Sequence, residues 1–328
     1  MATKTESRKK DHIDLVLSKD VQYQKDAGFD SVVLLHNALP EIDLAKVDLS
    51  CDFLGKRLKF PLIIEAMTGG YSKAGDINRS LAAAAQEAGV AMGLGSQRAM
   101  LETPSLAETF TIRKEAPDIP LLANIGAVQL KHYPVSEIEK LVSSVEANAL
   151  AVHLNALQEV IQPEGDHDFS GALHAISKLC EKLGVPVVVK ETGAGLSSDV
   201  ARRLKDAGVA WIDVAGSGGT SWSKVEYMRK GTIPGFEEWG IPTAESIKMC
   251  RGILPMIASG GIRSGVDVAK AIALGADIVG AAYPFLKAYE DERIAEELQM
   301  WKKQMGIAAF LTGSSNYEEL KRGKLLSG

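Results

Sequence analysis

Eight short apolar segments recur along the chain, and each is followed by a helical pattern or a long loop. Continuous apolar segments, without the alternation of a half-exposed strand, are typical of parallel strands that are buried on both faces. Eight such units are the number that closes a (β/α)8, or TIM, barrel. The segments are PLIIEAMTGG (61–70), AMGLGS (91–96), PLLANIGA (120–127), ALAVHLN (149–155), PVVVKETG (186–193), WIDVAGSGG (211–219), MIASGGI (256–262) and DIVGAA (277–282).

An open, doubly wound sheet is the main alternative to this barrel. Such a sheet usually carries a GxGxxG fingerprint after its first strand, whereas the first segment here ends in MTGG. Amphipathic stretches of helical period separate the segments, at 74–89, 136–148, 171–184 and 265–276. The sequence therefore predicts an α/β fold of the TIM-barrel type.

The predicted organisation is a single domain, because no linker rich in Pro, Ser or Gly divides the chain. We expect residues 1–60 to form an N-terminal extension and residues 61–328 to form the barrel with two C-terminal helices, near 290–305 and 316–323. The connections at 156–170 and 217–242 are longer than a βα loop needs, which is typical of lids and binding loops.

Composition limits the partners of the chain. Its 328 residues carry a net charge of −5, so a polyanionic ligand would need a local basic cluster, and neither nucleic acid nor a membrane surface is an expected partner. The three cysteines are far apart and form no CxxC pair, which argues against disulfides and cysteine–zinc sites. The first residues lack the apolar core of a secretory signal, and no apolar run of about 20 residues could span a bilayer. We expect a cytoplasmic protein.

Polar side chains stand at the carboxyl ends of nearly all the predicted strands, where TIM-barrel enzymes carry their chemistry. Burying so many polar groups is costly unless they meet partners or a ligand. The pattern therefore predicts a ligand site at this end of the barrel. The residues are Thr68, Ser96, Asn124, His153, Asn155, Lys190, Glu191, Ser217 and Thr220.

A phosphate site is predicted after the seventh and eighth strands, at SGGIRSG (259–265) and GAA (280–282). Glycines allow the backbone to approach a phosphate, and a helix N-terminus favours a dianion. Arg263 can add a charge-assisted hydrogen bond. Tight turns alone would explain one glycine pair, but the paired position of the two segments favours a phosphate.

Lys190 bears on the identity of the phosphate ligand. Its ammonium can stabilise negative charge on a flavin ring, while Thr68, Ser96 and Asn124 can supply neutral hydrogen bonds to the polar edge of that ring. Lys190 could instead form a Schiff base, as in an aldolase, or an interior ion pair with Glu191. The whole set of residues favours a flavin.

Ten sequence blocks together resemble the FMN-dependent, type 2 isopentenyl-diphosphate isomerase family. They occur in the family's order between residues 8 and 282, so the resemblance covers nearly the whole chain. The blocks are RKKDHI (8–13), AMTGG (66–70), GLGSQRAM (93–100), ANIGAVQL (123–130), HLNALQE (153–159), PEGD (163–166), VKETGAG (189–195), GSGGTSWSKVE (216–226), GIPT (240–243) and ASGGIRSG (258–265).

The resemblance implies reversible isomerisation of isopentenyl diphosphate to dimethylallyl diphosphate in isoprenoid biosynthesis. It implies reduced FMN, a divalent cation, usually Mg²⁺, and NADPH as the electron donor, with no net redox change. It also implies FMN contacts from Ala66, Met67, Thr68, Ser96, Asn124, Lys190, Thr220, Gly260, Gly261, Arg263, Ala281 and Ala282.

The resemblance further implies that the diphosphate contacts a basic and polar set of residues and that Glu159 binds the metal. The substrate-binding set is Arg8, Lys9, Arg98, His153, Asn155 and Gln158, the last near the reacting carbons. From the residues alone, Arg8 and Lys9 would form a flexible, solvated arm. Glu159 alone would be an exposed carboxylate favoured by a helix dipole.

Moving a double bond requires protonation of one carbon and deprotonation of its neighbour. Gln158 has no useful acidity, so we expect acid–base catalysis by reduced FMN with Gln158 positioning the substrate. Glu226, His153 and Trp222 are further catalytic candidates, as proton relays or in carbocation stabilisation. The face of Trp222 can stabilise positive charge, although the residue could equally pack in a lid.

Three other functions compete with isomerisation. An FMN-dependent 2-hydroxy-acid oxidase would carry an HxxR pair, and no histidine here has Arg three residues later. An inosine-monophosphate-dehydrogenase-like enzyme would need a cysteine in the loop GSGGTSWSK, which has none. A non-catalytic flavin-binding barrel is the third alternative. Family resemblance suggests a homo-oligomer, a tetramer or octamer.

Overall fold

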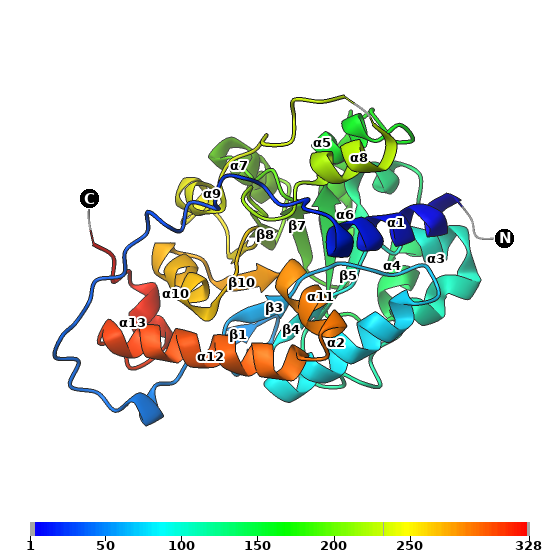
Figure 1. The fold of residues 1–328 in the computed structure, drawn as a ribbon. Helices are drawn as coiled ribbons and strands as arrows, with labels where there is room; N and C mark the ends of the chain where they lie inside the picture. The colour runs from blue at the N-terminus through cyan, green and yellow to red at the C-terminus, as the bar shows by residue number, and fades with distance from the viewer. Residues whose placement is uncertain (1–3, 232, 327–328) are drawn as a thin grey trace.

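Eight parallel strands close into a barrel in the order β10-β3-β4-β5-β6-β7-β8-β9 (Figure 1). The computed structural model describes residues 4–231 and 233–326. Every one of the eight apolar segments forms a strand, which confirms the predicted TIM barrel. The strands are β3 (Leu62–Ile64), β4 (Ala91–Gly93), β5 (Leu121–Gly126), β6 (Ala149–Leu154), β7 (Val187–Glu191), β8 (Trp211–Asp213), β9 (Met256–Ala258) and β10 (Ile278–Ala281).

The strands are apolar along their whole length because both of their faces are covered. In β3 all three residues are buried, and Ile63 pairs with Gly280 on one side and Ala91 on the other. One face of each strand points into the barrel and the other packs against the surrounding helices. This double burial explains why the strands lack the alternating pattern of a half-exposed sheet.

The helices that surround the barrel confirm all four amphipathic stretches to within a few residues at each end. Side-chain caps define two of the helix starts, since Ser197 accepts from the amide of Val200 and Ser264 accepts from that of Asp267. The helices are α2 (Ala74–Ala88), α4 (Val135–Ser144), α6 (Ala172–Lys182), α7 (Ser198–Asp206), α9 (Thr243–Cys250) and α10 (Gly265–Leu274).

A hairpin of β1 (Cys51–Phe53) and β2 (Lys56–Leu58) covers the amino end of the barrel. Phe53 is buried and packs edge-on against Trp211, with 4.9 Å between the ring centroids. Trp211 begins β8, so this contact lies at the end of the barrel opposite the predicted site. Before the hairpin, the extension contains a short 3-10 turn, η1 (Leu44–Lys46).

The C-terminal part differs from the prediction. Three helices follow β10, namely α11 (Tyr283–Glu290), α12 (Ile294–Leu311) and α13 (Tyr317–Lys321), where two were expected. The eight-residue α11 starts directly after the strand, with proline in its first turn, where proline is tolerated. The buried Trp301 of α12 packs against Phe285 of α11, and α12 lies against α10 and α2.

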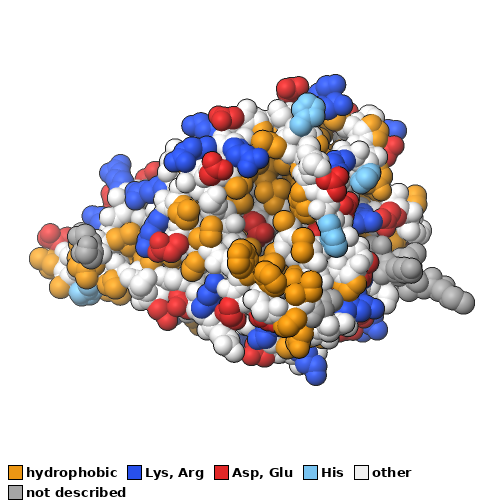
Figure 2. All heavy atoms as spheres, turned by 90° about the horizontal axis from the view of Figure 1, so that it is seen from above, with side chains coloured by type: hydrophobic (Ala, Val, Ile, Leu, Met, Phe, Trp, Pro, Cys, Tyr) orange, Lys and Arg blue, Asp and Glu red, His pale blue; other side chains and the backbone are white. Residues whose placement is uncertain are grey.

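Short helices frame the carboxyl end of the barrel. The N-terminal helix α1 (Lys4–Ser18) packs against α8 (Trp222–Lys230) and α11, while α5 (Ala156–Ile161) packs against α8. Seen from above, this face is hollowed and hydrophobic side chains surround the hollow (Figure 2). The remaining short helices are α3 (Arg98–Glu102), η2 (Pro104–Phe110) and η3 (Ala127–Lys131).

Two expectations about this end are corrected by the structure. Arg8 and Lys9 lie in α1, so they belong to a packed helix and not to a flexible arm. The long connections contain α5 and α8, so they are partly helical. Within the described part of the chain, no helix combines the length and hydrophobicity that crossing a bilayer requires.

Candidate active site

Two adjoining cavities open at the carboxyl ends of the strands. The first, which we name the central cavity, is lined by every residue expected to contact FMN except Thr68. The second, the basic cavity, is lined by Thr68 and by all the residues expected to bind the diphosphate or the metal. The structure therefore separates the two predicted sets into two neighbouring spaces. Their common wall is formed by Met67, Ser96, His153, Gln158 and Trp222.

The end of the central cavity where a phosphate is predicted combines a tight glycine loop with the side chain of Arg263. Gly261 has a φ of 72°, and a Cβ atom there would lie 2.6 Å from the Cβ of Ala27. Arg263 lies over the ring of Tyr283, 5.4 Å from its centroid, and donates to the side chain of Gln22. No carboxylate of the described residues forms an ion pair with Arg263, and burial lowers the pKa of its guanidinium. An anion beside this loop would supply the missing charge.

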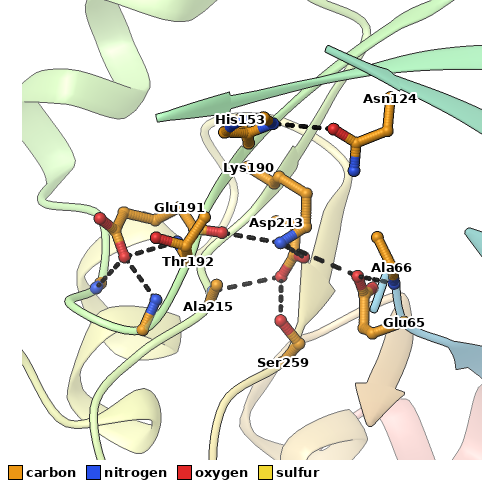
Figure 3. A network of polar contacts seen from close by, with 12 residues as sticks. Glu65, Ala66, Asn124, His153, Lys190, Glu191, Thr192, Asp213, Ala215 and Ser259 are labelled. Atoms are coloured by element: carbon orange, nitrogen blue, oxygen red, sulfur yellow. Dashed lines mark hydrogen bonds and ion pairs between the residues drawn. The ribbon is translucent and has the colours of Figure 1, made fainter. Parts of the chain in front are cut away.

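Lys190 lies at the floor of the central cavity among carboxylates that the sequence analysis did not single out (Figure 3). Its Nζ atom is 3.5 Å from Oδ2 of Asp213 and 3.8 Å from Oε2 of Glu65, and it donates to the main-chain oxygen of Glu191 at 2.8 Å. The interior ion pair considered for Lys190 therefore exists, but with Glu65 and Asp213. The carboxylate of Glu191 points away from Lys190 and accepts hydrogen bonds from the backbone amides of residues 192–195.

His153 is a hydrogen-bonding group without charge. Its Nδ1 atom lies 2.8 Å from Oδ1 of Asn124 (Figure 3). Burial and the nearby cations Lys190 and Lys9 lower the pKa of His153 to about 3. At neutral pH the imidazole is therefore uncharged, so it offers a ligand a hydrogen bond and no positive charge.

Lys9 reaches from α1 into the basic cavity. Its Nζ atom donates to the main-chain oxygens of Gly69, at 2.7 Å, and Ser96, at 2.6 Å. Burial and the charge of Arg8 lower the pKa of Lys9 to about 7. Arg98 lines the same cavity and donates to Glu102 at 2.6 Å. Three basic side chains thus face one small space in an acidic protein.

Glu159 is held in place at the edge of the basic cavity. It lies in the first turn of α5, is 8% exposed, and accepts from Asn155 at 2.9 Å and from the amide of Asp166 at 2.7 Å. The alternative of an exposed helix-start carboxylate is therefore wrong. Oδ1 of Asn155 is buried without a hydrogen-bond partner among the described residues. No group of three His, Cys, Asp or Glu side chains in this part of the chain could hold a metal alone.

Glu226 lies behind the cavities and not in their walls. It is fully buried, 2.8 Å from both Nε2 of His12 and Nε of Arg229. Burial raises the pKa of Glu226, but His12 and Arg229 outweigh burial and lower it, so the carboxylate is ionised at neutral pH. Gln158 donates to Glu226 at 3.4 Å, which links the carboxylate to the shared wall. Trp222 packs edge-on against His12, with 5.2 Å between centroids.

Several residues of this site were not predicted. His12 stands four residues after Arg8, so helical spacing places both on one face of α1, and this signal was available in the sequence. Arg229 likewise stands three residues after Glu226. Gln22, which donates to Thr220 at 3.2 Å, comes from an irregular segment of the extension and carries no such signal.

Comparison with known proteins identifies relatives of the whole chain. A family profile described as FMN-dependent dehydrogenase matches residues 125–327. An isopentenyl-diphosphate delta-isomerase of Rickettsia bellii (strain RML369-C) is 50% identical over 97% of this chain and 96% of its own length. The enzyme of the same name from Archaeoglobus fulgidus is 47% identical over 97% and 94%, and that from Nostoc sp. is 49% identical over 98% and 95%.

Solved structures with low identity share the fold. A lactate oxidase from Pediococcus acidilactici superposes with a TM-score of 0.68 at 17% identity, over 96% of this chain and 86% of that one. A mandelate oxidase variant with (S)-mandelic acid gives 0.68 at 20% identity, over 97% and 94%. These likenesses concern the barrel alone. The curated relatives, in contrast, match nearly end to end, and the chain therefore belongs to the FMN-dependent, type 2 isopentenyl-diphosphate delta-isomerase family.

Proposed function

We propose that the chain catalyses the reversible isomerisation of isopentenyl diphosphate to dimethylallyl diphosphate in isoprenoid biosynthesis, with FMN in the central cavity. The observation that carries this proposal is the common wall of the two cavities. A flavin in the central cavity and a diphosphate in the basic cavity would meet across Met67, His153 and Gln158. The hydrocarbon end of the substrate would then lie against the flavin ring, where proton transfer is needed.

The residues of the central cavity fit FMN. The glycine loop and Arg263, which forms no ion pair with a described carboxylate, suit the phosphate, Lys190 suits the polar edge of the ring, and Asn124 lies in the wall. Reduced flavin would supply ring nitrogens that carry and accept protons. Lys190 remains a cation because its carboxylate neighbours outweigh the effect of burial and raise its pKa. Its charge favours electron density on the ring.

The chain's own residues would bind and orient the substrate. Arg8, Lys9 and Arg98 offer charge-assisted hydrogen bonds to the diphosphate, and neutral His153 adds an uncharged one. Gln158 lies in the common wall and donates to ionised Glu226, so Glu226 can fix the orientation in which Gln158 places the hydrocarbon end. The unpartnered Oδ1 of Asn155 is a further acceptor at the basic cavity.

Mg²⁺, with Glu159 as its protein ligand, is part of this proposal. One carboxylate with substrate phosphate oxygens and waters is a usual magnesium site, and it agrees with the lack of a complete metal cluster in the described residues. NADPH as reductant, a cytoplasmic location and the role of residues 1–60 as a phosphate-binding extension are proposed on the family resemblance. The position of α1 beside the basic cavity supports the last of these.

A homo-oligomer is also proposed. Exposed apolar side chains gather where the extension and the C-terminal segment lie side by side: Val33 is 51% exposed, Leu39 is 73% exposed, and Leu326, whose amide donates to the oxygen of Val33, is 59% exposed. A second copy of the chain could cover these side chains. A single monomeric species in sedimentation velocity would refute this proposal.

The test of the main proposal is direct. The purified chain, supplied with FMN, Mg²⁺ and either NADPH or dithionite under anaerobic conditions, is expected to convert isopentenyl diphosphate into dimethylallyl diphosphate, followed by proton NMR. The oxidised protein is the control and should be inactive. Lack of conversion by the reduced protein would refute the proposal. Oxidation of 2-hydroxy acids by the oxidised protein in air, with O2 as the electron acceptor, would favour the oxidase alternative.

Gly261→Ala is expected to weaken FMN binding roughly 10- to 100-fold, the equivalent of the 1–3 kcal/mol typical of overpacking. The added Cβ would meet Ala27 at 2.6 Å and distort the phosphate loop. Gly171→Ala is the matched control, because Gly171 has a similar φ of 75° and open space around its Cβ position. Fluorescence titration with FMN measures the affinity. Equal losses in both variants would contradict a role for the loop's close packing.

Glu226→Gln is expected to lower kcat roughly 10²–10⁴-fold, the range for losing an acid–base group, with FMN affinity unchanged. The reason is that Glu226 is the ionised carboxylate linked to the shared wall through Gln158. Glu164→Gln is the control, since Glu164 contacts the other side of Arg229 and its side chain is 42% exposed. Steady-state kinetics would compare kcat of the two variants with that of the wild-type chain. A Glu226 variant with normal kcat would leave that carboxylate only a structural role.

A further inference from the structure

Beneath the central cavity, two buried carboxylates share a single ammonium group. Glu65 follows β3, Lys190 is in β7 and Asp213 ends β8, so the cluster joins three strands inside the barrel (Figure 3). They are 7%, 9% and 1% exposed, respectively. The Lys190 Nζ atom is 3.8 Å from Glu65 and 3.5 Å from Asp213. If both carboxylates were ionised, the cluster would carry one uncompensated negative charge.

The two carboxylates have unequal hydrogen-bond environments. Oδ1 of Asp213 accepts from the hydroxyl of Ser259 at 2.8 Å and from the amide of Ala215 at 3.1 Å, which stabilises the ionised form. Among the described residues, Glu65 accepts a longer bond, 3.3 Å, from the amide of Ala66. Glu65 is therefore protonated more readily than Asp213. Burial and the charge of Asp213 raise the pKa of Glu65 to about 7.

The remaining groups around the cluster do not neutralise the extra charge. His153 on β6 is uncharged, since its pKa is lowered to about 3 by burial and the nearby cations. Glu191 follows Lys190 on β7, and its carboxylate is satisfied by the amides of residues 192–195. The cluster can therefore become neutral only by binding a proton.

We propose that Glu65 and Asp213 are positioning residues for Lys190 that share one exchangeable proton. Asp213 holds the ammonium at the floor of the central cavity. Glu65 takes up a proton from solvent when a ligand places negative charge beside Lys190, so the total charge of the cluster and the adjacent ring does not change on binding. The first part concerns the chain alone. The second part rests on the proposed function, in which an anionic reduced flavin lies beside Lys190.

The proton-sharing part is tested by carboxyl ¹³C NMR of the full-length chain, with and without FMN. In the wild-type chain one carboxyl should titrate near pH 7. This titration should vanish in Glu65→Gln, and it should move to lower pH in Asp213→Asn, because burial still raises the pKa of Glu65 but the charge of Asp213 no longer does. Glu191→Gln is the matched control and should leave the titration in place.

The ligand-linked part is tested by the pH dependence of flavin affinity. Between pH 7 and 9, affinity for reduced FMN should fall by up to about tenfold per pH unit in the wild-type chain, because binding takes up one proton. Glu65→Gln should remove this fall. Oxidised FMN, whose ring is neutral, is the control and should show no such dependence in either protein. A merely structural role for Glu65 would not alter this profile.

The outcomes separate this inference from the proposed function. A wild-type Glu65 that titrates in the ordinary carboxyl range would overturn the inference, whether or not the protein isomerises its substrate. Failure of isomerisation would overturn the proposed function and leave the titration result standing. If Glu65→Gln does not fold, the wild-type chain and Asp213→Asn still test the inference, because the carboxyl titration must lie near pH 7 in the wild-type chain and at lower pH in the variant.

Discussion

Replacement of Lys190 by methionine is expected to lower the free energy of unfolding of the flavin-free chain by roughly 3–5 kcal/mol at pH 8, the usual effect of leaving a buried charge without its partner. The Lys190 ammonium lies within 4 Å of both Glu65 and Asp213. Without it, two buried carboxylates remain with no cation. Urea unfolding followed by circular dichroism measures the loss.

The loss should depend on pH, and its sign follows from linkage. The pKa of Glu65 is raised in the folded chain, from 4.5 to about 7. A carboxyl group with a raised pKa in the folded state contributes stability below its unfolded pKa, and this contribution is lost as the pH rises through the folded pKa. Removing the cation Lys190 raises the folded pKa of Glu65 further. The loss in the free energy of unfolding caused by Lys190→Met should therefore be larger at pH 8 than at pH 5.

Two controls make this result specific. The double variant Lys190→Met with Glu65→Gln should recover part of the lost stability at pH 8, because only Asp213 then remains unpaired. Lys178→Met, at an exposed position of α6, should change stability by no more than about 0.5 kcal/mol. If Lys190→Met lost the same free energy of unfolding at pH 5 and pH 8, the cause would be lost packing and not lost charge.

The double variant Arg8→Gln, Lys9→Gln is expected to raise KM for isopentenyl diphosphate roughly 10²–10⁴-fold, since a hydrogen bond to a charged group contributes about 1.5–3 kcal/mol. Both side chains line the basic cavity from α1. The affinity for FMN should stay nearly unchanged, because neither residue lines the central cavity. Lys10→Gln, an exposed position on the same helix, is the control. A normal KM in the double variant would refute the placement of the diphosphate.

The lowered pKa of Lys9 also predicts that substrate binding depends on pH. Burial and Arg8 lower its pKa to about 7, so in the absence of substrate its ammonium loses its proton as the pH rises through that value. A diphosphate binds the cation, so KM should rise above pH 7, by up to about tenfold per pH unit. Lys9→Arg should flatten the profile, because arginine stays protonated. A flat profile in the wild-type chain would contradict this role of Lys9.

The barrel and the tight glycine loop after β9 were predictable because they depend on local patterns. Continuous apolar segments show burial on both faces, and the glycines of SGGIRSG show a close backbone approach. Arg8 and Lys9 were placed at the site only by resemblance, since nothing local distinguishes a docked basic helix from a solvated one. The short α11 was missed because it begins without any connecting loop after β10.

Glu65 and Asp213 could not be predicted for a different physical reason. Each is an acidic residue at the end of an apolar strand, which the sequence shows, but their approach to Lys190 depends on barrel closure. Closure brings β3, β7 and β8 around one interior space, and the charge balance of that space belongs to three distant segments together. His12 and Glu226 are a similar case, since helix packing joins residues 214 positions apart.

The wall shared by the two cavities also has a thermodynamic consequence. Met67, His153 and Gln158 would touch both ligands, so a ligand on one side orders the surface that the other must bind. Binding of either ligand then changes the affinity for its neighbour, and linkage makes the two factors equal. If the diphosphate raises the affinity for the flavin by a given factor, the flavin must raise the affinity for the diphosphate by the same factor.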